Sequence, residues 1–419
     1  MTVLSKKFGA QWLGDLSDEW RQMRARYIFT ERKEKSTKDD IHLTPSQKYA
    51  VLPQLEYMKR TGNRVVLNLM GADNMKHVEK GDFIIHLRSF QGGIEYSAYT
   101  GKVSNAYTVL APKDNVNHNF FRYVLKSYGF ISELSRTTDQ LRDGQSVKFS
   151  QLDLLDFPLP TPETQQKIAD FLNQETVKID NLTHRQERLL QLLEEKRRAT
   201  ITHAVTRGLD PNVELKETNI PWLGKIPAHW KITKVGYEAK FESGGYPLPK
   251  NSNEPKTEPW ILIGDMKADA VEGRDGISKK DIDELRLRKA AKGELLFSFK
   301  MSIGKVAIAG HDTYTTSEIA TFYDMESILT EYAFYMFPIY IPRNAKKNMM
   351  GSDLMNLQLI RQAMIALPML EEQRKIVSFI SEECSKIKDL KQKIQTQITL
   401  LRERRTSLVS HAVTGKIKV

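Results

Sequence analysis

The chain has 419 residues, of which 40% are apolar and 27% are charged, a composition typical of a globular protein with two or three domains. Its one cysteine, Cys384, excludes an internal disulfide, and the lack of an apolar run of about 18 residues argues against a membrane span, so we expect a cytoplasmic protein. The net charge of +11 favours a polyanionic partner.

Residues 1–158 have the pattern of an α+β domain. Short apolar stretches bounded by turn residues, at 64–70 and 82–87, are typical of strands. Residues 117–134 are typical of a helix. We expect a mixed or antiparallel sheet in this first mixed domain.

The next segment, residues 159–209, predicts one long helix. Thr161 can cap its start, Pro162 suits the first helical position, and Gly208 is a suitable stop. Apolar residues recur at spacings of four and three, which is the heptad pattern of a coiled coil. A helix of about 45 residues is roughly 65 Å long. The predicted seam residues are Ile168, Leu172, Ile179, Leu182, Leu189 and Leu193.

The second half of the chain repeats this order. Residues 210–366 predict a second mixed domain, with strands at 259–266 and 293–298 and a helix at 328–337. Residues 367–419 predict a second long helix with the same heptad spacing. Its predicted seam residues are Ile376, Ile380, Ile387, Leu390, Ile394 and Leu401.

A direct alignment shows that the chain contains an internal repeat. Residues 159–206 align without a gap to 367–414, with 19 of 48 positions identical, and both copies end in His-Ala-Val-Thr. The segment "WLGDLSDEW" at 12–20 likewise matches "WLGKIPAHW" at 222–230. The two long helices are therefore natural partners for an intramolecular coiled coil. Either direction is physically possible, and we favour antiparallel because it gives the two halves a pseudo-twofold relation.

Motifs for catalysis or metal binding are missing from the sequence. There is no Gly-rich phosphate loop, no Cys-x-x-Cys and no His-Glu-x-x-His, so we expect no catalytic residue, no metal site and no cofactor in this chain. The repeated His203 and His411 stand near helix ends, where packing or capping is the more common role of a histidine.

Basic and polar residues near the predicted strand ends remain as candidates for DNA binding. Such side chains can hydrogen-bond phosphates or base edges, although ordinary exposed loops are the alternative for any single one. The candidates are Arg88, Ser89, Gln91, Arg142, Gln145 and Lys148 in the first mixed domain, and Lys300, Ser302, Lys305, Lys346, Lys347 and Asn348 in the second.

The repeated segments resemble a known family. "PLPTPETQQKIADFLNQETVKIDNL" with "LLEEKRRATITHAVTRG", and "ALPMLEEQRKIVSFI" with "LLRERRTSLVSHAVTGK", are similar to the two conserved spacer regions of type I restriction-modification specificity (S) subunits. Three positions depart from that pattern: Thr164 stands in place of Glu, Arg207 in place of Gly, and Lys388 in place of Asp. These departures put in doubt only contacts made at those positions.

The resemblance implies two target recognition domains, each reading half of a bipartite, asymmetric DNA site, joined by a helical spacer. It also implies partners: two modification (methyltransferase) subunits that use S-adenosylmethionine, and up to two restriction (translocase/endonuclease) subunits that use ATP and Mg²⁺. The chain itself would be non-catalytic. A nuclease with duplicated binding modules and a coiled-coil adaptor without a DNA role are the alternatives.

Overall fold

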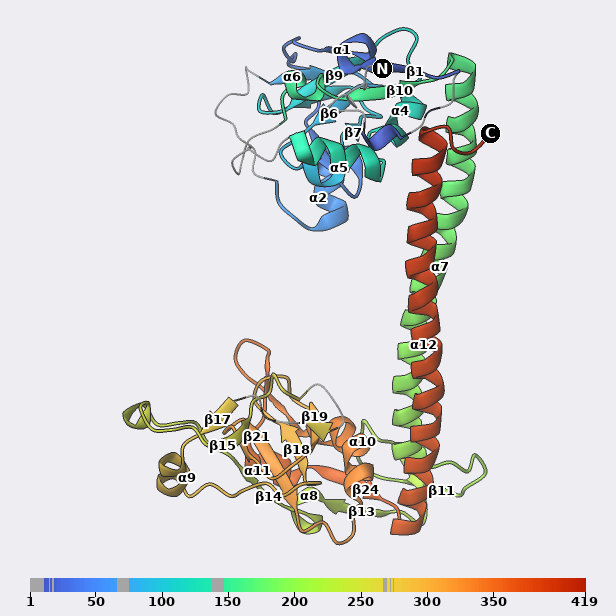
Figure 1. Ribbon diagram of the computed structural model, residues 1–419. Helices are drawn as coiled ribbons and strands as arrows, with labels where there is room; N and C mark the ends of the chain where they lie inside the picture. Colours follow the sequence, from blue (N-terminus) through green and yellow to red (C-terminus); the bar gives the residue numbers. More distant parts are fainter. Residues whose placement is uncertain are drawn as a thin grey trace, which may run out of the picture. The chain divides into compact units, whose positions relative to one another are not determined.

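The computed structural model describes residues 11–419, except for residues 15, 17–18, 66–74, 138–146, 267–269, 272 and 274. The chain divides into two compact units, residues 1–188 with 394–419 (unit 1) and residues 189–393 (unit 2). Each unit holds one mixed domain and parts of two long helices, α7 (Pro162–Arg207) and α12 (Leu370–Val413) (Figure 1). None of the described helices is both long and apolar enough to cross a membrane.

Unit 1 is built around a four-stranded antiparallel sheet of order β2-β9-β6-β7. Antiparallel pairs β1–β10, β3–β4 and β5–β8 flank it. The strands are β1 (Arg21–Arg24), β2 (Phe29–Glu31), β3 (Leu43–Ser46), β4 (Ala50–Pro53), β5 (Lys76–Val78), β6 (Phe83–Ile85), β7 (Glu95–Tyr96), β8 (Gly101–Val103), β9 (Thr108–Pro112) and β10 (Asp156–Leu159). The short helices are η1 (Gln11–Leu13), α1 (Ala25–Ile28), α2 (Gln54–Thr61), α3 (Ser89–Gly92), α4 (His118–Val124), α5 (Tyr128–Thr137) and α6 (Phe149–Leu152).

Unit 2 contains a five-stranded sheet of order β14-β21-β18-β19-β16 and a three-stranded sheet of order β17-β15-β20, both mixed. Its strands are β11 (Leu215–Glu217), β12 (Lys225–Pro227), β13 (Lys231–Lys234), β14 (Lys240–Ser243), β15 (Glu258–Ile261), β16 (Ala270–Val271), β17 (Asp275–Ile277), β18 (Leu295–Ser298), β19 (Val306–Ala309), β20 (Tyr314–Thr315), β21 (Ile319–Tyr323), β22 (Lys346–Lys347), β23 (Asp353–Leu354) and β24 (Met364–Leu367). Its helices are α8 (Val235–Glu238), η3 (Pro249–Asn251), α9 (Lys279–Leu285), α10 (Thr330–Tyr340), η4 (Ile341–Asn344) and α11 (Leu357–Gln362). The α+β class expected from the sequence is confirmed in both units.

A buried glutamine near the start of each long helix ties that helix to its mixed domain. Gln165 has no exposed surface. Its Nε2 donates to the carbonyl of Pro160 at 2.9 Å, and its Oε1 accepts from the amide of Asn117 at 2.8 Å. In unit 2, Gln373 makes the same two bonds, each 2.9 Å long, to the carbonyl that precedes α12 and to the amide before α10. The sequence repeat is therefore also a repeat of contacts.

The repeated His-Ala-Val-Thr segment places its apolar pair inside a mixed domain. Ala412 and Val413, at the end of α12, belong to the hydrophobic core of unit 1, and Ala204 and Val205 belong to that of unit 2. The hydroxyl of Tyr340 also donates to the carbonyl of Val205 at 3.0 Å. The Ala-Val pair thus packs the C-terminal end of each long helix into the hydrophobic core of a mixed domain.

Ion pairs within each unit show that α7 and α12 run antiparallel, as we favoured (Figure 1). As residue numbers rise along α7, the partners on α12 fall. The pairs are Asp180–Arg405 at 2.8 Å and Glu187–Arg402 at 2.9 Å in unit 1, and Glu194–Lys391 at 2.8 Å in unit 2. The hydrogen bond from Lys391 lowers the pKa of Glu194 although burial opposes this. Because these pairs are partly exposed, each stabilises the helix pair by less than about 1 kcal/mol.

The seam between the helices differs from the predicted one at three of the twelve predicted positions. Leu182, Leu189 and Leu390 are 44%, 42% and 47% exposed. The residues that directly follow these three leucines are better covered, since Thr183, Leu190 and Lys391 are half-buried. The remaining predicted positions are buried or half-buried: Ile168, Leu172, Ile179, Leu193, Ile376, Ile380, Ile387, Ile394 and Leu401.

The shift has a local physical cause in α7. Thr176 Oγ1 donates to the carbonyl of Leu172 at 2.6 Å, and Thr183 Oγ1 donates to that of Ile179 at 2.9 Å. Each hydroxyl is satisfied within its own helix, so a threonine can face the seam without an unpaired polar group. Leu182, beside Thr183, then lies on the flank.

We predict that Gln373→Ala destabilises the chain by about 2–4 kcal/mol, because it leaves a buried carbonyl and a partly buried amide without their partner. Thermal unfolding followed by circular dichroism measures the effect. Gln397→Ala is the matched control, since Gln397 is an exposed glutamine of the same helix and its loss should change stability by less than about 0.5 kcal/mol. Equal midpoints for the two variants would contradict the role given to Gln373.

Candidate nucleic-acid interface

In unit 1, two of the predicted DNA-contacting residues lie on the surface around α3. Arg88 and Gln91 are exposed. Ser89 is not: it has no exposed surface, and its Oγ accepts from the amide of His86 at 2.9 Å. The buried hydroxyl of Ser89 thus completes the turn that leads from β6 into α3.

The turn between β3 and β4 adds residues that the sequence reasoning missed. Gln47 and Lys48 are exposed, and Gln47 Nε2 donates to the carbonyl of Arg88 at 3.1 Å. The ammonium of Lys48 lies 5.1 Å from the ring centre of Tyr49. A basic residue next to an aromatic one, in a tight turn between two short strands, is the sequence pattern that could have marked this turn as a candidate for DNA binding. Gln47, Lys48, Arg88 and Gln91 form one exposed polar surface, named here the α3 surface.

The other predicted residues of unit 1 do not join this surface. Lys148 is exposed at the start of α6, where it lines a separate hollow of about 710 Å³ together with Arg26 and Lys76. Arg142 and Gln145 lie outside the described residues.

In unit 2, the predicted residues lie on two segments that approach each other. Lys300 and Ser302 are exposed in the loop after β18, and Lys346 and Lys347 are exposed on β22. A methyl group on Gly304 would lie 3.0 Å from Cγ of Pro342 in η4, which leads directly into β22. The loop after β18 therefore packs against η4, the short helix that precedes the hairpin.

Two predicted residues of unit 2 have structural roles. Lys305 is half-buried, and its Nζ donates to the carbonyl of Ile263 at 2.8 Å. Asn348 Oδ1 accepts from the amides of Met350 and Ser352, both at 2.9 Å, and so shapes the turn between β22 and β23. Neither interaction is visible in the sequence, because each depends on a backbone group placed by the fold.

A cleft of about 750 Å³ lies in unit 1 against the long helices. Three of its four cations are already engaged by the protein, and the fourth, Lys48, is part of the α3 surface. Arg122 is hydrogen-bonded to Asn173, and Arg405 is paired with Asp180. Lys126 is paired with the buried Glu95. Since a phosphate would have to displace these partners, the α3 surface is better suited to a nucleic acid than the cleft.

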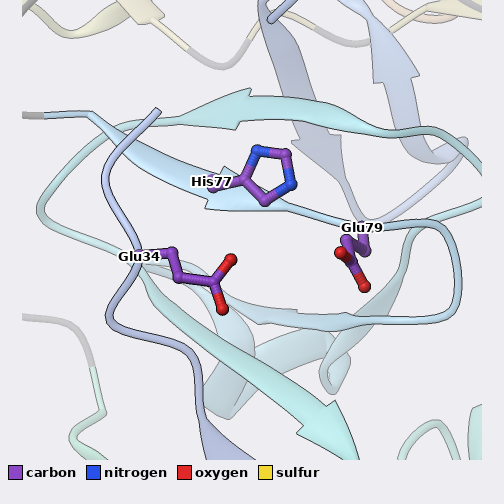
Figure 2. Close-up of side chains that lie close together, drawn as sticks. All are labelled: Glu34, His77 and Glu79. Atoms are coloured by element: carbon purple, nitrogen blue, oxygen red, sulfur yellow. The ribbon is translucent and has the colours of Figure 1, made fainter. Parts of the chain in front are cut away.

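Glu34, His77 and Glu79 lie close enough together to hold a metal ion, and Figure 2 shows the three side chains side by side. Arg32 already pairs with Glu34 at 3.2 Å and with Glu79 at 2.9 Å. His77 Nδ1 lies 2.9 Å from a carboxylate oxygen of Asp40. Burial favours a raised pKa of Asp40, but hydrogen bonds from His77 and a backbone amide prevail and lower it. A guanidinium paired with both glutamates disfavours a metal ion at this position.

Comparison with known proteins identifies the family. The type I restriction modification DNA specificity domain matches residues 17–191 and 227–400. The MjaIX specificity subunit of Methanocaldococcus jannaschii is 27% identical over 176 residues, which is 40% of this chain and 40% of that protein. The EcoKI specificity subunit of Escherichia coli is 22% identical over 323 residues, or 74% of this chain and 68% of that protein.

Two solved structures share the fold. A chain from a study of complex assembly and conformational transition of the type I R-M system has a TM-score of 0.74 at 15% identity, covering 96% of this chain and all of that one. The HsdS subunit from Thermoanaerobacter tengcongensis has a TM-score of 0.57 at 15% identity, covering 96% and 98%.

This protein is a DNA-recognition component, and the chain belongs to the type I restriction-modification DNA specificity family, with one copy of the domain in each half.

We predict that Lys346→Ala weakens DNA binding and lowers the slope of log K against log salt by about 0.9, the effect of losing one phosphate contact. Fluorescence anisotropy with labelled duplex at several salt concentrations measures the slope. Lys386→Ala is the control, because Lys386 lies on α12 and pairs with Glu382 and Glu383. An unchanged slope for Lys346→Ala would mean that Lys346 on β22 does not contact a DNA phosphate.

Proposed function

We propose that this chain selects the DNA target of a type I restriction-modification complex, with each mixed domain reading one half of a bipartite, asymmetric site. The mixed domains would span residues 1–158 and 210–366, and the spacer segments 159–209 and 367–419. In this proposal the paired long helices set the unspecified gap between the two half-sites.

We base this proposal on a duplicated scaffold that holds different loops. Gln165 and Gln373 make the same two hydrogen bonds, and the Ala-Val pair that ends each long helix enters a domain core in the same way. The exposed segments differ: unit 1 presents the β3–β4 turn beside α3, whereas unit 2 presents the β22–β23 hairpin. Identical supports with different reading loops suit a target whose two halves differ.

The symmetry of DNA gives a physical reason for the duplication. The backbone of a duplex has twofold symmetry, so two related readers can approach a groove in the same manner on opposite strands. The divergent loops then read unlike bases. One chain with an internal repeat thus achieves what a homodimer achieves, without the requirement for a palindromic site.

In this proposal the chain is a non-catalytic scaffold. Two modification subunits would bind S-adenosylmethionine and methylate adenine N6, after the base is flipped into a pocket of their own. Up to two restriction subunits would translocate and cleave DNA with ATP and Mg²⁺. The chain would supply the DNA contacts and the attachment surfaces, and no cofactor.

Methylome sequencing of cells that express the chain with its modification subunit tests the proposal. We expect N6-methyladenine at one bipartite motif with an unspecified gap, and loss of this methylation without the chain. A methylated motif that does not depend on the chain would contradict the proposal. Cleavage or methylation by the purified chain alone would favour an enzyme, and absence of salt-dependent DNA binding would favour an adaptor.

Single substitutions in the two units test whether each unit reads a different half-site. We expect Arg88→Ala to relax the sequence requirement in one half of the motif and Lys300→Ala to relax it in the other, by about 1–3 kcal/mol where the side chain contacts a base. The same methylome experiment measures both. If both variants relax the same half, the assignment of one unit to each half-site is wrong.

A further inference from the structure

The hairpin of β22 and β23 carries at its tip two methionines whose side chains are almost fully exposed to solvent. Met349 is 106% exposed and Met350 is 92% exposed, the highest values among the large apolar side chains in the described part of the chain. Leu354, opposite Lys346 in the hairpin, is also half exposed. Single exposed apolar residues are common, but an adjacent pair at the end of a projecting turn is typical of an interaction site.

The turn that carries the methionines is held in a defined shape. Asn348 Oδ1 accepts from the amides of Met350 and Ser352, and Asn348 also exchanges backbone hydrogen bonds with Ser352 and Gly351, at 2.9 Å in each case. Gly351 has a φ of +81°, which favours glycine. Because the tip is already ordered, little conformational freedom is lost when it meets a partner.

The charges around the hairpin identify the chemistry of that partner. Lys346 and Lys347 stand at the base of the hairpin, and Arg343 precedes it in η4. Lys300 lies in the loop that approaches η4, and it too is exposed. Asp353 pairs with Lys347 at 2.7 Å, and residues 343–354 still carry a net positive charge beside their apolar tip. This combination complements a duplex, in which phosphates border a stack of apolar base faces.

We propose that the β22–β23 hairpin inserts Met349 and Met350 between adjacent base pairs of the half-site read by unit 2, while the surrounding cations bind the flanking phosphates. Apolar wedges of this kind, methionine included, unstack a base step and kink the duplex. A thioether side chain is flexible and polarisable, so it can pack against different base faces. This inference rests on the proposed function and adds a way of reading DNA by deformability to contacts with base edges.

Insertion at this point also bears on catalysis by the partner subunits. A base next to an unstacked step has lost part of its stacking energy, so its extrusion from the duplex costs less. The hairpin would then lower the barrier to base flipping in its own half-site without touching the target base.

The test uses the full chain assembled with its modification subunits, and duplexes that carry 2-aminopurine at successive positions in and beside the half-site read by unit 2. This base fluoresces more strongly when it is unstacked. We expect a severalfold rise at one step on binding of the unaltered complex. The double variant Met349→Ala/Met350→Ala should lose this rise while its Kd changes by less than about tenfold, because methionine burial and the cost of unstacking oppose each other.

Two comparisons make the result specific. Met369→Ala is the matched control, since Met369 is 75% exposed immediately before α12, away from the hairpin sequence, and its loss should leave the fluorescence rise intact. Probes in the other half-site should respond equally in the double variant and the unaltered complex. Thermal unfolding should be unchanged for both variants because these side chains are exposed.

Other outcomes overturn the inference in distinguishable ways. Specific binding without any unstacking signal, or a signal that survives the double substitution, would reject the wedge and leave the proposed function intact. Loss of modification subunits from the purified complex of the double variant would instead assign the methionines to a protein contact. Absence of sequence-specific binding by the unaltered complex would reject the proposed function itself.

Discussion

The constraint on which the rest of the structure depends is the need to cover one side of each long helix. α7 and α12 have 46 and 44 residues. Each carries an apolar seam along its length, and the two seams follow the same heptad spacing. A helix with such a seam is not stable alone in water, because its stability comes from packing rather than from propensity. Within each unit, the segments of α7 and α12 cover one another, and the mixed domain covers the helix ends.

The helix ends explain why the repeated sequence is concentrated where it is. At the start of a long helix, the buried glutamine satisfies a carbonyl and an amide that no regular element satisfies, and at the end an Ala-Val pair fills a core. Both tasks tolerate few residue types, since one requires an amide of fixed length and the other a small apolar volume. The exposed middle of the helices has no such restriction, and there the two copies diverge.

The same distinction explains how much could be predicted from the sequence. The repeat, the two long helices and the α+β class follow from periodicity and alignment, which report burial averaged over many residues. The antiparallel direction was favoured only because it relates the two halves by a pseudo-twofold axis. The seam was misplaced at Leu182, Leu189 and Leu390, because periodicity assigns leucines inward. For Leu182, periodicity also does not detect that the neighbouring Thr183 satisfies its own hydroxyl. Single positions depend on local hydrogen bonds that a pattern does not encode.

The candidate interface was less predictable than the fold for a related reason. The exposure of Arg88, Lys300 and Lys346 was predictable, because a long cation in a turn is exposed in almost any fold. Polar residues with short side chains were ambiguous: Ser89 and Asn348 bind their own backbone instead of facing a partner.

Met349 and Met350 were passed over altogether, since an apolar residue is assigned to a core unless the turn that exposes it is known. Their exposure follows from Asn348 and Gly351, which set the turn, so the residues that shape the turn determine which side chains it presents. In this protein the contacts that attach the long helices to the mixed domains are repeated. A substitution in such a turn residue would alter the surface that faces DNA without disturbing those contacts, and could therefore change the DNA target.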